Sequence, residues 1–342
     1  MKITVFSAKS WDREYLPKAN QDKHELKFVP SRLDVDHAEL AKGSEAVCLF
    51  VNDDGGKESL GALNKLGIKL VLMRCAGFNN VDLEEAKSLG MQVMTVPGYS
   101  PYAVAEHAVA LILSLNRKIH KSYNRVRENN FELTGLLGFD IHGKTVGVLG
   151  TGKIGQVFAG IMKGFGVKLI GYDKFKSDQL VKDTGLEYVE LDELFAQSDI
   201  ISVHLPLLKD TKYIINNKAI EKMKKGNVST SASHLTSPDV MIVNTSRGAL
   251  IDTKAVIAGL KKGQIGHLGL DVYEEEESLF YEDNSGKVLQ DDTFARLLTF
   301  PNVLITGHQA FFTREAQENI CSTTMQNAED FLSGKKTDNA KC

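Results

Sequence analysis

Short apolar runs alternate with longer mixed segments along the first hundred residues of the chain. The runs have the length of buried strands, and the segments between them repeat apolar residues at helical spacing. This alternation predicts a mainly parallel sheet with helices on its faces. The expected strands are Ile3–Phe6, Leu26–Val29, Ala46–Phe50, Leu70–Arg74 and Gln92–Val96, and the expected helices include Asp34–Ala41 and Leu83–Leu89.

A longer helix is expected next, from Tyr102 to Lys121. Its residues are apolar on nearly every side between Val104 and Leu115. A helix that is apolar all round is buried. We therefore expect it to lie between domains or in a subunit interface.

A second series of strands and helices begins near Thr145. Its expected strands are Val146–Leu149, Val167–Gly171, Ile200–His204, Val240–Ser246, Leu268–Asp271 and Val303–Thr306, with helices at Gln156–Phe165 and Thr313–Leu332. A chain of 342 residues is too long for one ordinary core. We expect one discontinuous domain of residues 1–100 plus 307–342, to which the closing helix returns, and a second domain of residues 101–306.

In one segment, apolar residues recur at neither helix nor strand spacing. Asn227–Asp239 is rich in serine and threonine and precedes the expected strand at Val240. It is longer than the usual connection of roughly 2–6 residues in such folds, so it is interpreted as an exposed inserted loop.

The second series opens with a glycine-rich turn, Gly150-Thr151-Gly152-Lys153-Ile154-Gly155, between a strand and a helix. An acidic residue, Asp173, follows the next strand. This context indicates a dinucleotide site, with the diphosphate at the helix N-terminus. A carboxylate at Asp173 favours NAD over NADP because it repels a 2′-phosphate.

Composition narrows the class of protein. Apolar content of 42% and charged content of 25% are typical of a globular protein, and a net charge of −3 gives no reason to expect a nucleic acid or an anionic membrane as partner. The apolar run near the first residues is too short for a signal peptide, and we expect it to form a strand instead. Four scattered cysteines have no spacing that indicates a disulfide framework or a metal site. We expect a cytoplasmic protein without a metal.

Three later stretches carry residues that suit hydride transfer to a keto acid. Arg247 follows a strand and could bind a carboxylate, although a single arginine there is as often on the surface. Asp271 ends a strand before four consecutive glutamates, and composition does not select one of them. His308 could exchange a proton with an alkoxide, although a lone histidine is more often structural. His204 we expect to line the adenine side of the cofactor.

Together these blocks resemble the D-isomer-specific 2-hydroxyacid dehydrogenases over nearly the whole chain. The blocks are GTGKIG with Asp173, NTSRG at Asn244–Gly248, DVYEEE from Asp271, and GHQAF from Gly307. Arg74–Asp82 and Val96–Pro101 are similar to the D-lactate dehydrogenase branch. The resemblance implies two Rossmann-like or flavodoxin-like, doubly wound α/β domains with a cleft between them.

The resemblance also implies roles for individual residues. It places the substrate-binding arginine on Arg247, the proton donor on His308 and the glutamate that keeps the imidazole protonated on Glu276. Substrate contacts fall on the backbone of Ala76, Gly77 and Phe78 and on the side chains of Tyr99 and Phe311. Cofactor contacts beyond the glycines Gly150, Gly152 and Gly155 fall on Lys153, Ile154, Asp173, Leu205, Pro206, Thr211, Thr245, Ser246 and Asp271.

The implied activity is reversible, NAD-dependent reduction of pyruvate to (R)-lactate by a homodimer or homotetramer. Two alternatives stay open at this point. The same chemistry could act on a bulkier or different 2-keto acid, such as phenylpyruvate, 2-ketoisocaproate or hydroxypyruvate, because one methylene is worth only about 1–3 kcal/mol of discrimination. The chain could also be a non-catalytic NAD-sensing scaffold that keeps the same residues.

Overall fold

The computed structural model describes residues 1–225 and 240–342, so the expected loop at 227–239 lies outside the described residues. The chain divides into two compact units. Unit 1 comprises Met1–Ser100 and Phe312–Cys342, and unit 2 comprises Pro101–Phe311. Unit 1 therefore resumes at Phe312 and not at residue 307. The intervening residues stay with unit 2 because the Asp271 carboxylate accepts hydrogen bonds from the backbone N–H groups of Gln309 and Ala310.

Unit 1 is built on a five-stranded parallel sheet with the order β2-β1-β3-β4-β5. Each expected strand is present, with ends within two residues of the prediction. The strands are β1 (Lys2–Val5), β2 (Glu25–Phe28), β3 (Ala46–Leu49), β4 (Leu70–Met73) and β5 (Gln92–Met94). The helices are α1 (Ser10–Asn20), η1 (Ala38–Ala41, a 3-10 turn), α2 (Lys57–Lys65), α3 (Leu83–Ser88) and α12 (Arg314–Leu332).

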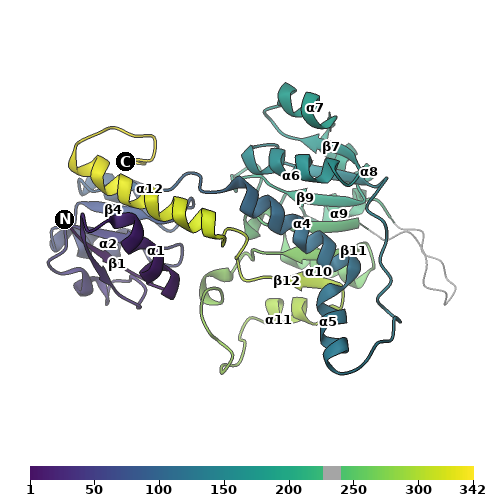
Figure 1. The fold of residues 1–342 in the computed structure, drawn as a ribbon, viewed down its shortest axis with the longest axis horizontal. Helices are drawn as coiled ribbons and strands as arrows, with labels where there is room; N and C mark the ends of the chain where they lie inside the picture. Colours follow the sequence, from purple (N-terminus) through teal and green to yellow (C-terminus); the bar gives the residue numbers. More distant parts are fainter. Residues whose placement is uncertain (226–239) are drawn as a thin grey trace. The chain divides into compact units, whose positions relative to one another are not determined.

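Helices cover both faces of this sheet. Apolar residues of α2, α3 and η1 form one core cluster with the strands, and those of α1 and α12 form another. The return of α12 to unit 1 confirms the expectation for the closing helix (Figure 1). The expected helix Asp34–Ala41 is wrong in its first half. The Asp34 side chain accepts a hydrogen bond from the backbone N–H of His37, a local turn that competes with helix formation.

Unit 2 contains a seven-stranded parallel sheet with the order β12-β11-β10-β9-β6-β7-β8. Its strands are β6 (Thr145–Leu149), β7 (Lys168–Tyr172), β8 (Glu187–Tyr188), β9 (Ile200–Val203), β10 (Val240–Asn244), β11 (Ile265–Leu270) and β12 (Val303–Ile305). Its helices are α4 (Pro101–Arg117), α5 (Ile119–Arg127), α6 (Lys153–Lys163), α7 (Asp178–Thr184), α8 (Leu191–Gln197), α9 (Asn217–Lys222), η2 (Gly248–Leu250), α10 (Thr253–Lys261), η3 (Glu276–Ser278) and α11 (Asp292–Leu298).

This is a doubly wound sheet with a core on each face. Side chains of α4 and α6 pack on one face, and those of α8, α9, α10 and α11 pack on the other. The strand order reverses at β6, whose neighbours are β9 and β7. In open parallel sheets, ligands bind beyond the carboxyl ends of the strands at such a reversal. The expected fold class is confirmed for both units.

The long helix expected from Tyr102 to Lys121 is interrupted. Lys118 adopts a left-handed backbone with φ of 51°, so α4 ends at Arg117 and α5 begins at Ile119. The Asn116 side chain donates to the carbonyl of Phe139 and accepts from its N–H, which fixes a crossing segment at this break. The apolar residues of α4 pack on α6 and on β10–β12 of the same unit, which accounts for their burial. None of the described helices has the length and apolarity needed to cross a bilayer.

Candidate active site

The glycine loop lies where β6 meets α6. Gly150 has φ of 96°, a conformation that side chains rarely adopt. A Cβ on Gly155 would lie 2.0 Å from the carbonyl oxygen of Gly150, so only glycine lets α6 pack this closely on the turn. A Cβ on Gly152 would meet no atom within 4 Å, which leaves the start of α6 open to a ligand. The loop therefore fits a dinucleotide diphosphate at the helix N-terminus.

Asp173 follows β7 and faces this loop. One oxygen of its carboxylate accepts from the backbone N–H of Thr151 at 2.6 Å, and the other accepts from the N–H of Phe175 at 2.9 Å. These contacts orient the carboxylate beside the glycine loop. Lys174 is paired with Asp210 at 2.8 Å, so its charge is directed away from Asp173.

The other expected cofactor residues lie after β9 and β10. Leu205 is buried and Pro206 exposed, and the carbonyl of Pro206 accepts from the Thr211 hydroxyl at 2.6 Å. The Ser246 hydroxyl donates to the carbonyl of Val203 at 2.9 Å. Thr245 differs, because its hydroxyl is buried and has no hydrogen-bond partner within the described part of the chain. Lys153 is exposed and Ile154 half-buried at the start of α6.

His204, which is expected to line the adenine side of the cofactor, lies against the glycine loop, since a Cβ on Gly150 would come within 2.7 Å of its carbonyl. It is buried directly after β9, with its ring centroid 4.8 Å from that of Phe158 and its Nε2 2.9 Å from the Ser202 hydroxyl. Burial lowers its pKa to about 3. It is thus a neutral core histidine.

Arg247 is half-buried just beyond β10. The buried side chain of Asn244 shapes the turn, since it accepts from the N–H of Ser246 at 3.0 Å and donates to the carbonyl of Arg247 at 2.8 Å. Gly248 permits close packing on the next loop, because a Cβ there would lie 2.1 Å from the carbonyl carbon of Tyr273. The guanidinium donates to the carbonyl of Ser246 at 2.7 Å.

His308 and Glu276 form a hydrogen-bonded pair. The Nδ1 of His308 lies 2.7 Å from Oε1 of Glu276, and the side chains are 17% and 20% exposed. The second oxygen of Glu276 accepts from the backbone N–H of Tyr273 at 2.9 Å. A carboxylate only accepts hydrogen bonds, so Nδ1 carries a proton and Nε2 is left as the nitrogen that exchanges one. Of the neighbouring glutamates, Glu275 and Glu277 are exposed.

The backbone at His308 is unusual, with φ of 52°. Such strain at a residue with a side chain persists only where the surroundings impose it, and it is concentrated at functional sites. Here the N–H of His308 donates to the carbonyl of Asp271 at 2.7 Å, and its carbonyl accepts from the hydroxyl of Tyr281 at 3.0 Å. Sequence reasoning did not select Tyr281, and nothing in the pattern around it distinguishes it.

Asp271, which is expected to bind the cofactor, has a fully buried side chain whose two oxygens accept hydrogen bonds within unit 2. They accept from the Thr306 hydroxyl at 2.5 Å and from the N–H groups of Gln309 and Ala310, both at 2.9 Å. His107 of α4 lies 3.3 Å from the same carboxylate. Burial raises the pKa of this carboxyl, but the hydrogen bonds from His107, Thr306 and Ala310 outweigh burial and lower it. Asp271 therefore anchors the segment that carries His308.

The expected substrate residues are divided between the units. In unit 1, Ala76, Gly77 and Phe78 are half-buried directly after β4, and Tyr99 is half-buried near the end of the first segment. In unit 2, Phe311 is buried, with its ring centroid 6.3 Å from that of His308.

Within unit 2, the strand order brings the three candidate catalytic residues to neighbouring strand ends. Arg247 follows β10, Glu276 lies beyond β11, and His308 follows β12, and these strands are adjacent and parallel. This edge offers a guanidinium for an anion and an imidazole paired with a carboxylate for proton transfer. Among the described residues, no group of three or more histidine, cysteine or acidic side chains could hold a metal ion.

Comparison with known proteins gives consistent matches. Residues 109–310 match the model of the D-isomer specific 2-hydroxyacid dehydrogenase, NAD binding domain. The chain is 50% identical over 340 residues to a 2-hydroxyacid dehydrogenase homolog of Haemophilus influenzae, covering 99% of this chain and 98% of that one. It is 49% identical over 340 residues to the D-lactate dehydrogenase of Escherichia coli, covering 99% of both. The solved pyruvate reductase of Chlamydomonas reinhardtii superposes with a TM-score of 0.91 at 43% identity, covering 99% of this chain and 98% of that one.

Proposed function

The chain belongs to the D-isomer-specific 2-hydroxyacid dehydrogenase family, and we propose that it is an NAD-dependent D-lactate dehydrogenase that interconverts pyruvate and (R)-lactate. The observation that carries this proposal is the His308–Glu276 pair at 2.7 Å, which lies beyond the ends of β12 and β11, beside the end of β10 that Arg247 follows. A scaffold that only senses NAD needs no such pair, whereas the reduction of a ketone needs a proton donor.

NAD is the cofactor of this family, and the residues of unit 2 fit it. Gly150, Gly152 and Gly155 provide the turn and the open helix N-terminus for the diphosphate, and Asp173 would accept hydrogen bonds from the adenine ribose. The hydroxyl of Thr245, which has no hydrogen-bond partner among the described residues, would gain one from the ligand. When bound, the cofactor supplies or accepts the hydride.

The protein's own contribution is to hold the keto acid and to move a proton. Arg247 would bind the carboxylate and the neighbouring carbonyl oxygen with its fork of donors. The imidazole of His308, protonated on both nitrogens, would donate the Nε2 proton to the carbonyl oxygen as that oxygen becomes an alkoxide. Glu276 would stabilise the imidazolium through Nδ1. In the reverse direction Nε2 takes the hydroxyl proton from lactate.

The backbone N–H groups of Ala76, Gly77 and Phe78 would bind the same carboxylate, and Tyr99 and Phe311 would contact the methyl group of pyruvate. Contacts with a single methyl group discriminate only weakly between substrates. The bulkier acids phenylpyruvate and 2-ketoisocaproate, and the polar hydroxypyruvate, are therefore the comparison substrates. The E. coli relative is named for D-lactate and the Chlamydomonas protein for pyruvate, which favours pyruvate here.

We also infer a homo-oligomer, a dimer or a tetramer, from the surface of α5. Ile119, Tyr123 and Val126 are exposed on one face of this helix at 57%, 59% and 47%. Phe131 and Leu133, which follow it, are exposed at 70% and 79%. Exposed apolar side chains on one face of a helix are typical of an interface. The four free cysteines support a cytoplasmic location, where thiols stay reduced.

The proposal is tested with the purified protein by following NADH oxidation with pyruvate, phenylpyruvate, 2-ketoisocaproate and hydroxypyruvate in parallel. We expect the highest kcat/KM with pyruvate and a product that only D-lactate-specific reagents detect. His308→Gln should lower kcat by about 10²–10⁴-fold. His142→Gln, at an exposed histidine of the same unit, should not lower it. Light scattering should give a dimer or tetramer. No turnover with any of the four acids would favour the scaffold.

A further inference from the structure

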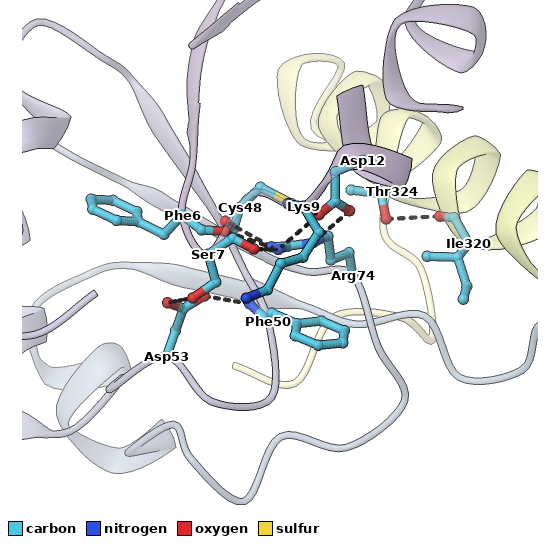
Figure 2. Close-up of polar contacts among 10 residues, drawn as sticks. All are labelled: Phe6, Ser7, Lys9, Asp12, Cys48, Phe50, Asp53, Arg74, Ile320 and Thr324. Carbon is cyan, nitrogen blue, oxygen red and sulfur yellow. Dashed lines mark hydrogen bonds and ion pairs between the residues drawn. The ribbon is translucent and has the colours of Figure 1, made fainter. Parts of the chain in front are cut away.

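Unit 1 contains a buried arginine just after β4, shortly before the expected substrate segment Ala76–Phe78, and all three of its guanidinium nitrogens donate hydrogen bonds. Arg74 is 3% exposed. Its guanidinium donates to the carbonyls of Phe6, Ser7 and Cys48 at 2.9, 3.0 and 3.3 Å. Figure 2 shows these carbonyls converging on it from the ends of β1 and β3.

The charge of Arg74 is balanced by Asp12, which is also 3% exposed. The guanidinium donates to the two oxygens of this carboxylate, from Nε at 3.0 Å and from Nη2 at 3.3 Å. Asp12 lies in the first turn of α1 and also accepts from the backbone N–H of Lys9 at 2.9 Å. One side chain thus joins the start of α1 to the ends of β1, β3 and β4 (Figure 2). Only a planar fork can make these bonds together.

A second set of contacts holds the far end of the segment that follows Arg74. The Asn80 side chain donates to the carbonyls of Phe50 and Asp53 at 3.1 and 2.7 Å. The N–H of Gly55 donates to the carbonyl of Asn80, and the carbonyl of Gly55 accepts from Asp82, each at 2.9 Å. The segment from Cys75 to Asp82 is therefore fixed to the loop after β3 at one end and to Arg74 at the other.

That loop is in turn fixed by a buried carboxylate. Asp53 is 1% exposed and accepts from the Ser7 hydroxyl at 2.7 Å, from the N–H of Leu33 at 2.7 Å and from the N–H of Phe50 at 2.6 Å. The guanidinium carbon of Arg74 lies 4.9 Å from the centroid of the Phe50 ring. Figure 2 shows Asp12 and Asp53 on opposite sides of the arginine, with Ser7 adjoining both sets of bonds.

We propose that Arg74 is a positioning residue for substrate binding: through Asp12 and three strand-end carbonyls it fixes the backbone N–H groups of Ala76–Phe78 that receive the carboxylate of the 2-keto acid. This inference rests on the proposed function, which assigns that segment to the substrate. Arg74 does not bind the substrate itself, since all three of its guanidinium nitrogens donate within unit 1 and its side chain is 2% exposed. It acts within unit 1, so binding of NADH to unit 2 is independent of it.

The experiment compares Arg74→Lys and Asp12→Asn with a matched control in the same unit. Lysine keeps the charge but cannot span four acceptor groups, and asparagine keeps the shape of Asp12 but loses its charge. The control is Asn20→Ala, which removes another buried side chain whose amide exchanges hydrogen bonds with the backbone of His24 before β2. Steady-state kinetics with pyruvate and the binding of oxamate, a non-reducible isostere of pyruvate, are measured beside NADH affinity by fluorescence titration.

We expect Arg74→Lys to raise the pyruvate KM and the oxamate Kd at least about tenfold, because a displacement near 1 Å can cost about 10²-fold. The Kd of NADH should change by less than about twofold, the usual additivity error between independent sites. Asp12→Asn should show the same pattern more weakly, and Asn20→Ala should leave all constants unchanged. If Arg74→Lys does not fold, Asp12→Asn decides.

Unchanged pyruvate KM and oxamate Kd in the folded variant would overturn the inference. Equal losses in NADH and oxamate binding, or the same losses in Asn20→Ala, would show a general structural effect and overturn it as well. If the unmodified protein does not reduce any of the four acids, the proposed function fails instead, and this is seen before any variant is made.

Discussion

Acidification is expected to destabilise unit 2 through the buried histidine beside the glycine loop. The ring of His204 packs on Phe158, and its Nδ1 has no hydrogen-bond partner in the described ranges 1–225 and 240–342. Burial lowers its pKa to about 3. In the unfolded chain a histidine has a pKa of about 6.5. Between these values the unfolded chain binds a proton that the folded protein does not.

The sign and the size of the effect follow from this difference. Stability from the neutral ring is complete above about pH 6.5 and is lost as the pH falls towards the folded pKa of about 3. This group lowers the free energy of unfolding by about 1.4 kcal/mol for each pH unit below 6.5. The free energy of unfolding is therefore about 2 kcal/mol lower at pH 5 than at pH 8. This loss of stability also concerns the glycine loop that is proposed to bind the cofactor. A Cβ on Gly150 would lie only 2.7 Å from the carbonyl of His204, so the two turns are packed together.

Urea unfolding at pH 8 and pH 5 measures this contribution. His204→Gln keeps a side-chain partner for the Ser202 hydroxyl but does not titrate, so the difference between the two pH values should shrink by about 2 kcal/mol. His142→Gln, at an exposed histidine, should leave the difference unchanged. A pH dependence in His204→Gln equal to that of the unmodified protein would refute the assignment of His204 as a neutral core residue.

Much of the fold could be predicted from local pattern. A short apolar run bounded by turn residues is typical of a fully buried strand, and the runs at β3 and β4 are buried completely in the parallel sheet. The glycine turn could also be predicted from the sequence, because Gly150 and Gly155 each meet a steric requirement that no other residue satisfies. The place of the candidate catalytic residues followed from the same logic, since parallel strands bring their carboxyl ends to one edge.

Other features depend on contacts that no local pattern contains. At the break at Lys118, Asn116 binds a segment 23 residues further along the chain, a contact that the helical pattern itself does not contain. The choice of Glu276 among four glutamates depends on a turn in which the backbone N–H of Tyr273 fixes one oxygen.

The contacts of Asp271 could not be predicted from the local pattern either. Its position at a strand end was visible in the sequence. The sequence did not show that Thr306, Gln309 and Ala310 would turn back and occupy its oxygens.

Three further outcomes are expected. Iodoacetamide at neutral pH should label Cys48 and Cys321 only after unfolding, because burial raises the pKa of their thiols to about 11 and about 12; mass spectrometry that finds either labelled in the folded protein would contradict this. Asp173→Ala should reduce the preference for NADH over NADPH, measured as the ratio of kcat/KM values, because it removes the charge that repels a 2′-phosphate. Glu276→Gln should move the upper pH limit of pyruvate reduction downward. The amide carries no charge to stabilise a protonated imidazole 2.7 Å away, and it has one acceptor oxygen where the imidazole and a backbone N–H now use two. Glu277→Gln makes the same change at an exposed neighbour, so a shifted limit there, or an unshifted one in Glu276→Gln, would mean that the pairing in the structure does not operate in catalysis.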